Sequence, residues 1–571
     1  MNPRKLFPFL AWLPFQRDAL KADFMAGLTV ALVLVPQSMA YAQLAGLPPY
    51  FGLYAAFLPV IVAAMWGSSN QLGTGPVAVA SLLTASSLAP LATPGSEQFV
   101  ALAIMLALMV GVVQLTLGVF KLGVVVNFLS HPVIVGFTNA AAMIIGLSQV
   151  NKLIGVPMGR SESFVNDIWG VVQRVGDTHA MTLAMGVTAI MIMWVIRKKA
   201  PKLPGVLIAV VLTTTVAWLT GYAEAGGQVV GSIPTGLPAL GLPPFSMEQA
   251  GQLLSAAIVI SLVGFMEAIS IAKAIAAKTK QKIDPNQELI GQGLANLVGA
   301  ATQAFPVSGS FSRSAVNINA GAKTGMSSVF TGLFVLLTLL LLTPLLYHLP
   351  QAVLAAVIIM AVIGLINFAA IKHAWQANKH DGIASVVTFV ATLAYAPHLD
   401  KGIMIGAGLA LVLYLYRTMT PRVAILGRYT DGTLRDAKVH NLPPSDVVTA
   451  VRFDGRLYFA NVSFFEDAIL EAVATNPQAP YLLIVADGIN EMDASGEEVM
   501  HHLVDRLRSG GVTLVFSGLK KQVLDVMRAT GLLEHVGRHS IHATADQALA
   551  HIYAQDKAPH AQDALQFVPT R

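Results

Sequence analysis

Long apolar runs recur between Ala22 and Tyr416, and this pattern limits the possible folds more than any other feature of the chain. Runs of about 17–25 residues, coiled into helices, have the length that crosses about 30 Å of hydrocarbon. Only 12% of the 571 residues are charged, which is about half the share typical of soluble proteins. Charged residues return at ordinary density from Arg417 onward. The sequence therefore predicts a multi-span membrane part that is followed by a soluble part.

The apolar runs predict about fourteen membrane segments and hence an all-α membrane domain. Two of the segments, 77–90 and 311–321, are too short to cross a bilayer as regular helices. The segments lie at 22–40, 48–66, 77–90, 98–119, 128–150, 180–196, 204–222, 252–277, 286–302, 311–321, 326–347, 351–370, 382–396 and 402–416.

Lysine and arginine residues gather after the even-numbered segments. Since such residues concentrate in cytoplasmic loops, an even number of segments with both termini in the cytoplasm explains their placement. The same placement accounts for the net charge of +5, so nucleic acid is not expected as a partner. The absence of cysteine excludes disulfides and thiol ligands and is consistent with a bacterial inner membrane. The basic residues are Lys121, Arg197, Lys198, Lys199, Lys202, Lys278, Lys280, Lys282, Lys323, Lys372, Lys379, Arg417 and Arg422.

These changes in composition predict where the domains begin and end. Residues 1–21 carry no small-residue cleavage site and are expected to be a cytoplasmic lead-in rather than a signal peptide. The transmembrane domain is expected to cover 22–418 and a linker to cover 419–440. An α/β domain is expected at 441–555, and 556–571 is expected to be a flexible tail.

The two short segments share a composition that breaks a membrane helix. Gly73–Ser81 and Phe305–Val316 both contain Gly, Pro and Ser or Thr residues, followed by small residues that can start a helix. Non-helical backbone at membrane depth has to be buried in protein or line a polar cavity, because an unsatisfied amide in lipid costs several kcal/mol. The segments are the third and the tenth, so each is third in its own half of seven. This correspondence predicts a seven-plus-seven inverted repeat with a binding site at the broken segments.

Half-helices that start at mid-membrane present free backbone N–H groups and the positive ends of their dipoles, so the expected ligand is an anion. Arg313 adds a positive charge to one of them, and a guanidinium matches the geometry of an oxyanion. The alternative is that both segments are ordinary helix kinks and that Arg313 is a loop residue near the cytoplasmic face.

Glu267 lies in the middle of the eighth segment. A carboxylate there costs about 3 kcal/mol on insertion scales, so we expect it to face a cavity or a partner. The functional interpretation is a proton- or cation-coupling site, and the alternative is a structural hydrogen bond to a neighbouring helix. Gln37 and Tyr41 are four residues apart and share a helix face. They either face the same site or form hydrogen bonds between helices.

After Pro421, strands alternate with helices, which predicts a small α/β sandwich. No phosphate loop, metal cluster or catalytic group of residues stands out, so we expect no cofactor, no metal and no enzymatic activity. We interpret Asp487, Asp493 and Ser495 as strand-end and helix-cap residues rather than as a catalytic group. The expected strands are 447–453, 457–459, 481–485 and 512–516, and the expected helices are 462–474, capped by Asn461, 495–509, 519–529 and 543–553.

The membrane part contains several distinctive stretches, namely Pro36–Ala42, Ala45–Pro49, Gly52–Tyr54, Gly75–Val79, Asn286–Gly291, Gly293–Asn296, Gly309–Asn317 and Ala320–Thr324. Together they resemble the sulfate permease family, the bacterial relatives of plant sulfate transporters and of animal anion exchangers of the solute carrier 26 type. The soluble part resembles the STAS domain, which is named after sulfate transporters and anti-sigma-factor antagonists. The resemblance covers nearly the whole chain.

The resemblance implies a core domain that moves against a gate domain and an anion bound between the third and tenth half-helices. It also implies a homodimer in lipid with cytoplasmic STAS domains, to which a further protein can bind. Ile271 stands where a sodium-coupled bicarbonate member would carry a hydroxyl, which argues against sodium coupling. By match of motif, the residues expected at the anion are Val77, Ala78, Ser312 and Arg313, with Gln37 and Tyr41 nearby and Glu267 as the coupling acid.

The resemblance is greatest to plant-type proton-coupled sulfate transporters, because of residues 312–317 together with Glu267. The predicted function is therefore proton-coupled uptake of an oxyanion, sulfate first, by alternating access. The alternatives are transport or exchange of bicarbonate, dicarboxylate or chloride, or an anion-binding membrane sensor that signals through the STAS domain. Ala494 occupies the position that is phosphorylated in anti-sigma antagonists, so regulation by phosphorylation at that point is not expected.

Overall fold

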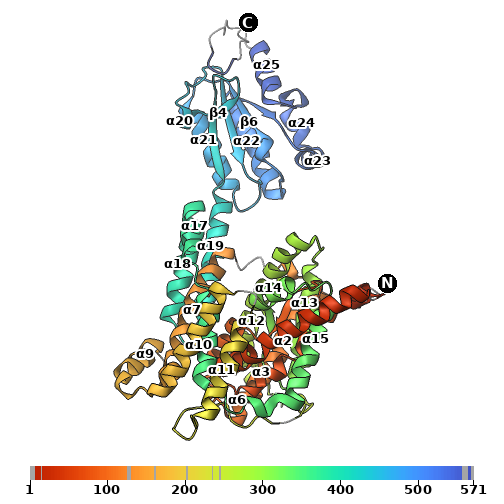
Figure 1. Ribbon diagram of the computed structural model, residues 1–571. Coiled ribbons are helices and arrows are strands. Elements are labelled where there is room, and N and C mark those ends of the chain that lie inside the picture. Colours follow the sequence, from red (N-terminus) through yellow and green to blue (C-terminus); the bar gives the residue numbers. More distant parts are fainter. Residues whose placement is uncertain are drawn as a thin grey trace. The chain divides into compact units, whose positions relative to one another are not determined.

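The computed structural model describes residues 7–14, 16–124, 130–159, 163–200, 203–234, 236–243, 246–555 and 563–566. The chain divides into two compact units, Met1–Ala410 and Leu411–Arg571, which are described separately below (Figure 1). Lys202, the first residues of the expected lead-in and most of the expected tail at 556–571 lie outside the described residues.

Each of the fourteen predicted segments coincides with a helix or with consecutive helices, and the last of them, 402–416, runs across the boundary between the two units. Among the described residues, eight helical stretches are long and apolar enough to cross a membrane. The remaining segments are shorter or broken. In chain order the helices are α2 (Arg17–Leu44), α3 (Tyr50–Ala55), α4 (Leu58–Trp66), α5 (Ala78–Leu88), α6 (Glu97–Val119), α7 (His131–Ser148), α10 (Ala180–Lys199), α11 (Gly205–Leu219), α12 (Met247–Thr279), α13 (Pro285–Ala301), α14 (Phe311–Asn319), α15 (Met326–Leu337), α16 (Gln351–Ile363), α17 (Phe368–Ala377), α18 (Lys379–Ala394) and α19 (Leu399–Met419).

Two regions that the sequence suggested were loops contain helices. The stretch after the fifth segment includes α8 (Val150–Ile154) and α9 (Phe164–Gln173). In α9, Val165, Trp169 and Val172 lie at helical spacing, which is the pattern of a surface helix rather than of a membrane span. Lys372 lies inside α17 and Lys379 begins α18, so the basic connection after the twelfth segment is itself helical.

The helix packing relates the two halves of the first unit. The first segment, α2, packs against the eleventh, α15; Figure 1 shows α2 in red and α15 in green. The fourth segment, α6, packs against the eighth, α12. The fifth, α7, packs against the thirteenth, α18, and the sixth, α10, against the twelfth, α16. If segments one to seven are exchanged with segments eight to fourteen, the contact of the first with the eleventh corresponds to that of the eighth with the fourth. The contact of the fifth with the thirteenth corresponds in the same way to that of the twelfth with the sixth. The unit is therefore an all-α membrane domain with a seven-plus-seven repeat, as expected from the broken segments.

Helix α3 approaches α2 backbone to backbone at Gly52. A Cβ atom at Gly52 would lie 2.0 Å from the carbonyl oxygen of Ser38 and 2.7 Å from the nitrogen of Met39. Because these are backbone atoms of a buried helix, they cannot rotate away. The contact therefore fixes α3 against the turn of α2 that carries Gln37 and Tyr41.

A Gly52→Ala variant is expected to lose its native fold. Overpacking a core costs about 1–3 kcal/mol and more where the neighbours cannot move, which exceeds the roughly 1 kcal/mol that alanine gains in a helix over glycine. Thermal unfolding and size-exclusion chromatography in detergent measure the loss. Gly170→Ala, in α9, is the control, because a Cβ there meets nothing within 4 Å. Equal behaviour of the two variants would contradict the close approach.

The second unit contains a six-stranded sheet in the order β4-β3-β5-β6-β7-β8. The β4–β3 and β3–β5 pairs are antiparallel, and the remaining pairs are parallel. The elements are β3 (Arg422–Arg428), β4 (Leu434–Asp436), α20 (Ala437–His440), β5 (Val448–Asp454), α21 (Val462–Thr475), β6 (Tyr481–Val485), α22 (Ala494–Ser509), β7 (Thr513–Ser517), α23 (Lys521–Thr530), α24 (Leu532–Val536), β8 (Ile541–His542) and α25 (Ala545–Gln555).

Both faces of this sheet are covered, which explains why its central strands are apolar at nearly every position. Alternate strand residues such as Leu482 and Ile484 pack against α21, α22, α23 and α24. The residues between them, such as Leu483 and Val485, pack against α25 (Figure 1). The second unit is therefore the α/β sandwich that the sequence predicted.

The structure differs from the sequence prediction at several places in this unit. Residues 457–459 do not form a strand, because only Leu457 makes a bridge, to Met492, and Phe459 is 72% exposed. Asn461 precedes α21 but its side chain does not cap the helix; its amide accepts from the N–H of Tyr458 instead. Residues 422–436, expected to be part of a linker, form the β3–β4 hairpin.

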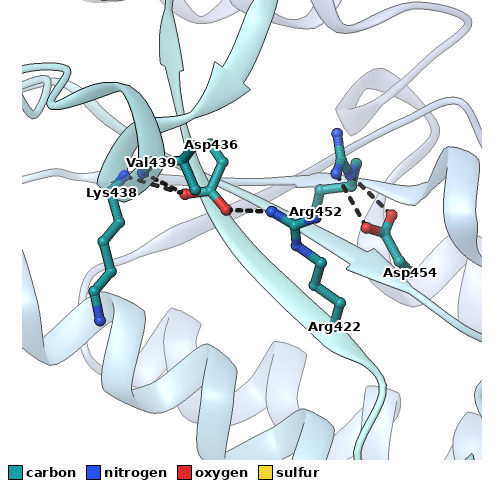
Figure 2. A network of polar contacts seen from close by, with 6 residues as sticks. All are labelled: Arg422, Asp436, Lys438, Val439, Arg452 and Asp454. Carbon is teal, nitrogen blue, oxygen red and sulfur yellow. Dashed lines mark hydrogen bonds and ion pairs between the residues drawn. The ribbon is translucent and has the colours of Figure 1, made fainter. Parts of the chain in front are cut away.

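A polar network holds the β3–β4 hairpin and the end of β5 (Figure 2). Nη2 of Arg422 donates to Oδ2 of Asp436 at 2.8 Å, and Oδ1 of Asp436 accepts from the backbone N–H groups of Lys438 and Val439. The hydrogen bond from Arg422 lowers the pKa of Asp436. Arg452 binds both carboxylate oxygens of Asp454, two residues along the same strand.

Candidate functional site

The third and tenth segments meet at the start of their helices. The extended backbone before α5, β1 (Gly73–Gly75), pairs antiparallel with the extended backbone before α14, β2 (Ser308–Ser310), and all six residues are buried. Each strand thus provides hydrogen-bond partners for backbone groups of the other where the chain is not helical. Both segments are broken, as the sequence predicted, and the two half-helices begin side by side.

Buried polar side chains of α13 hold the two strands. The amide of Asn296 accepts from the N–H of Val307 at 2.9 Å and donates to the carbonyl of Val307 at 3.1 Å, as a neighbouring strand would. One helical turn earlier, Nε2 of Gln292 donates to Oγ1 of Thr74 at 2.9 Å. The backbone N–H of Gly73 donates to Oγ of Ser314 at 2.8 Å, which ties β1 to α14 directly. The start points of both half-helices are therefore fixed to one another and to α13.

Replacement of Asn296 by alanine is expected to weaken both stability and anion binding. The variant leaves two backbone groups of Val307 unpaired in the interior, at about 1–3 kcal/mol for each buried unpaired group. Thermal unfolding in detergent with and without added sulfate measures both effects. Thr302→Val is the control on the same helix, because Thr302 bonds only to carbonyls of its own helix. A variant with wild-type stability would show that Asn296 does not hold the strand.

One cavity of about 470 Å³ opens at the start of both half-helices. It is also lined by α10, α11 and α16 through residues such as Met193, Gly205 and Val357. The predicted residues on its wall are Gln37, Tyr41, Val77, Ala78, Glu267 and Ser312. The structure therefore brings six of the seven predicted site residues together around one space.

The half-helices present their N-termini to this cavity. Val77 is the N-cap of α5 and offers no side-chain acceptor to the N–H groups of the first turn. The hydroxyl of Ser310 caps α14 by accepting from the N–H of Arg313 at a long distance of 3.5 Å. The first N–H groups of a helix have no partner within the helix, and the helix dipole adds positive potential there. Two such termini at one cavity favour an anion.

Arg313 lies behind the wall of the cavity rather than on it. Its side chain is 1% exposed, and none of its three guanidinium nitrogens has a hydrogen-bond partner among the described residues. Nη2 would lie 3.3 Å from a Cβ atom on Gly75, whose φ of +144° is one that other residues rarely adopt. Arg313 is thus a helical, buried residue and not a loop residue. Its position behind the β1 strand was not predicted.

Glu267, Gln37 and Tyr41 all face the cavity. Glu267 is partly accessible there, whereas Tyr41 is buried. Oε1 of Gln37 is buried and has no hydrogen-bond partner among the described residues. One turn after Glu267, Ile271 packs against Leu72 in an apolar cluster.

Sequence reasoning missed several residues of the site. Gln292 and Asn296 lie four residues apart in an apolar segment, and this buried polar pair was the signal that was available. Arg197 was assigned only to a basic loop, but it lines the same cavity from the end of α10. In the second unit, Asp493 is the helix cap that was expected, since it accepts from the N–H of Gly496 at 2.9 Å.

Comparison with known proteins gives matches over nearly the whole chain. The model of the sulfate permease family matches residues 20–388, and that of the STAS domain matches residues 441–548. "Sulfate transporter 4.1, chloroplastic" from Arabidopsis thaliana is 35% identical over 556 residues, which cover 93% of this chain and 80% of that protein. A probable sulfate transporter from Mycobacterium tuberculosis is 30% identical over 539 residues, 94% of this chain and 96% of that protein.

A solved structure shares the fold of both units. The murine anion transporter Solute Carrier 26 family member A9 matches with a TM-score of 0.87 and 24% identity, over 96% of this chain and 94% of that one. At this identity the likeness concerns the fold alone.

Proposed function

Since the chain belongs to the sulfate permease family, a family of membrane transporters, we propose that it takes up an oxyanion, sulfate first, together with a proton. One observation supports this above all others. Two half-helix N-termini open into one cavity. An arginine with no hydrogen-bond partner among the described residues lies behind its wall, and a carboxyl group lies on the wall. The names of relatives that are called sulfate transporters support sulfate as the first candidate among the oxyanions.

The anion would bind at the first turns of α5 and α14. Backbone N–H groups near Val77, Ala78 and Ser312 donate to its oxygens, and the hydroxyl of Ser312 adds a further donor. The guanidinium of Arg313 supplies a full positive charge from behind β1, and its nitrogens form no hydrogen bond within the part of the chain that the structure describes. Gln37 and Tyr41 offer polar groups from α2.

Glu267 would carry the proton. An ionised carboxylate on the wall of the cavity repels an oxyanion, and a protonated one does not. Anion and proton therefore favour one another at this site, which is the requirement for symport. Ile271, one turn further along α12, lies in an apolar cluster, and these surroundings favour coupling to a proton over coupling to a sodium ion.

Alternating access would move the half-helices past the part of the cavity wall that α10, α11 and α16 form. The predicted site residues on the rest of the wall come from α2, α5, α12 and α14. The packing of α10 against α16 and α11, and of α12 against α6, supports two groups that slide as units. Arg197, at the basic end of α10, lines this cavity, so the placement of basic residues supports an opening toward the cytoplasm. In this proposal the chain lies in a bacterial inner membrane, with both termini inside, as a homodimer.

Reconstituted uptake tests the proposal. The purified chain in proteoliposomes should accumulate labelled sulfate faster with an inward proton gradient than without one. Unlabelled bicarbonate, dicarboxylate and chloride serve as competitors. If one of these anions competes more strongly than unlabelled sulfate, that anion and not sulfate is the substrate. If the rate of uptake does not depend on the gradient, transport is not coupled to protons.

The main alternative is an anion-binding sensor that signals through the STAS domain. Its specific prediction is binding without flux. Saturable sulfate binding to the detergent-solubilised protein, combined with no uptake or exchange in proteoliposomes, would favour the sensor and contradict transport.

A further inference from the structure

We infer that the STAS domain contains a binding site for a divalent transition metal, with zinc as the best match, formed by His501, Asp505 and His535. The ligand atoms of these three side chains all lie within 4.8 Å of one another. The inference is independent of the proposed transport function, because all three residues belong to the second unit.

The scaffold places the three side chains by ordinary helix geometry. His501 and Asp505 are four residues apart on α22 and so share a face of that helix. His535 lies on α24, where Leu532, Leu533 and Val536 are buried on both sides of it. Met500, Leu503, Val504 and Leu507 anchor α22 in the same apolar core. The two helices are therefore held in register, and the cluster lies at their shared edge.

The contacts within the cluster are close but incomplete. Nε2 of His535 lies 2.7 Å from Oδ1 of Asp505, yet the two are not aligned as a hydrogen bond. That nitrogen is buried and has no hydrogen-bond partner among the described residues. The imidazole rings of His501 and His535 are stacked, with centroids 3.9 Å apart and an angle of 24° between their planes. Two imidazoles and a carboxylate thus lie close together, and one ring has to rotate out of the stack for its in-plane lone pair to reach the same ion as the other.

This donor set fits zinc. Imidazole and carboxylate ligands bind Zn²⁺ at about 2.0–2.2 Å in tetrahedral geometry, which sets ligand atoms about 3.3 Å apart. The distance of 2.7 Å between Nε2 of His535 and Oδ1 of Asp505 has to increase only slightly to admit an ion. Asp505 is exposed, so its side chain can adjust and a fourth position faces solvent. Arg508 donates to the backbone carbonyl of His535 at 2.7 Å and fixes α24 to α22 without occupying the ring.

A titration with Zn²⁺ tests the site. The tag-free, full-length protein in detergent, stripped with a chelator, should bind one Zn²⁺ per chain in calorimetry. Loss of residues that merely support a metal ligand costs about 10–100-fold in affinity. His501→Ala and His535→Ala should therefore weaken binding by about tenfold or more. Co²⁺ in place of Zn²⁺ should give the intense visible absorption of a tetrahedral site, and the same variants should abolish it.

His502→Ala is the matched control. His502 is the next residue on α22 and is not part of the cluster, so its loss removes one imidazole and should leave affinity unchanged. Asp505→Asn tests the carboxylate at an exposed position, where folding is not at risk, and should also weaken binding. Absence of saturable binding, or an equal loss in the His502→Ala variant, would overturn the inference.

Discussion

An Arg313→Gln variant should lose sulfate uptake while its folded structure becomes no less stable. At an effective dielectric constant of about 20, a unit charge about 6 Å from an anion contributes about 3 kcal/mol, which is roughly a 100-fold loss of affinity. The guanidinium is 1% exposed and has no hydrogen-bond partner among the described residues. A buried charge without a partner costs several kcal/mol, so its removal relieves the fold. Binding of labelled sulfate and thermal unfolding in detergent measure the two effects.

Two further variants sharpen this experiment. Arg197→Gln removes an arginine from the cavity wall rather than from behind β1, and it should reduce affinity much less. Arg313→Lys keeps the charge on a shorter donor and should retain part of the binding. If the Arg313→Gln variant binds sulfate with wild-type affinity, or unfolds much earlier, Arg313 is a structural residue and not a source of charge for the site.

A Glu267→Gln variant should exchange anions across the membrane but lose the ability to use a proton gradient. Glutamine resembles the protonated acid in shape and charge, so the anion can still enter. In the wild-type protein each pH unit supplies about 1.4 kcal/mol per proton, which corresponds to about tenfold accumulation. In the variant the ratio of uptake with and without a gradient should fall to about one. Labelled sulfate flux into proteoliposomes under both conditions measures this ratio.

The control for coupling is Glu248→Gln. Glu248 lies in the first turn of α12, on the same helix as Glu267, and does not line the cavity. This variant should keep the response to the gradient. Retention of the response in Glu267→Gln as well would assign the proton to another group.

The membrane segments were predictable because a bilayer requires apolar runs of a minimum length, and eight helical stretches among the described residues have that length. The broken third and tenth segments were predictable for the related reason that Gly and Pro cannot form regular helices at membrane depth. Glu267, on the wall of the cavity, follows the same rule, since a carboxylate within an apolar segment has to face polar surroundings. Its role in coupling stays a prediction.

Features that depend on contacts distant in sequence were not predictable in the same way. The pairing of Gly73 with Ser310 and the strand-like bonding of Asn296 arise only when both halves are folded together. Arg313 was expected at the anion, but its place behind β1 depends on the space that Gly75 leaves. The β3–β4 hairpin was missed even though Asp431-Gly432 lies at its turn, and that dipeptide is a strong hairpin signal.

The β1–β2 ladder has a consequence for biosynthesis. Gly73–Gly75 leaves the ribosome about 230 residues before Ser308–Ser310, which is roughly 10–50 s at ordinary rates of synthesis. During that interval the third segment is too short to span a bilayer and its extended backbone has no strand to pair with. Membrane insertion of the first half is therefore incomplete until the tenth segment arrives. Newly made chains that are truncated between the two strands should be substrates for quality-control proteases, however apolar their helices are.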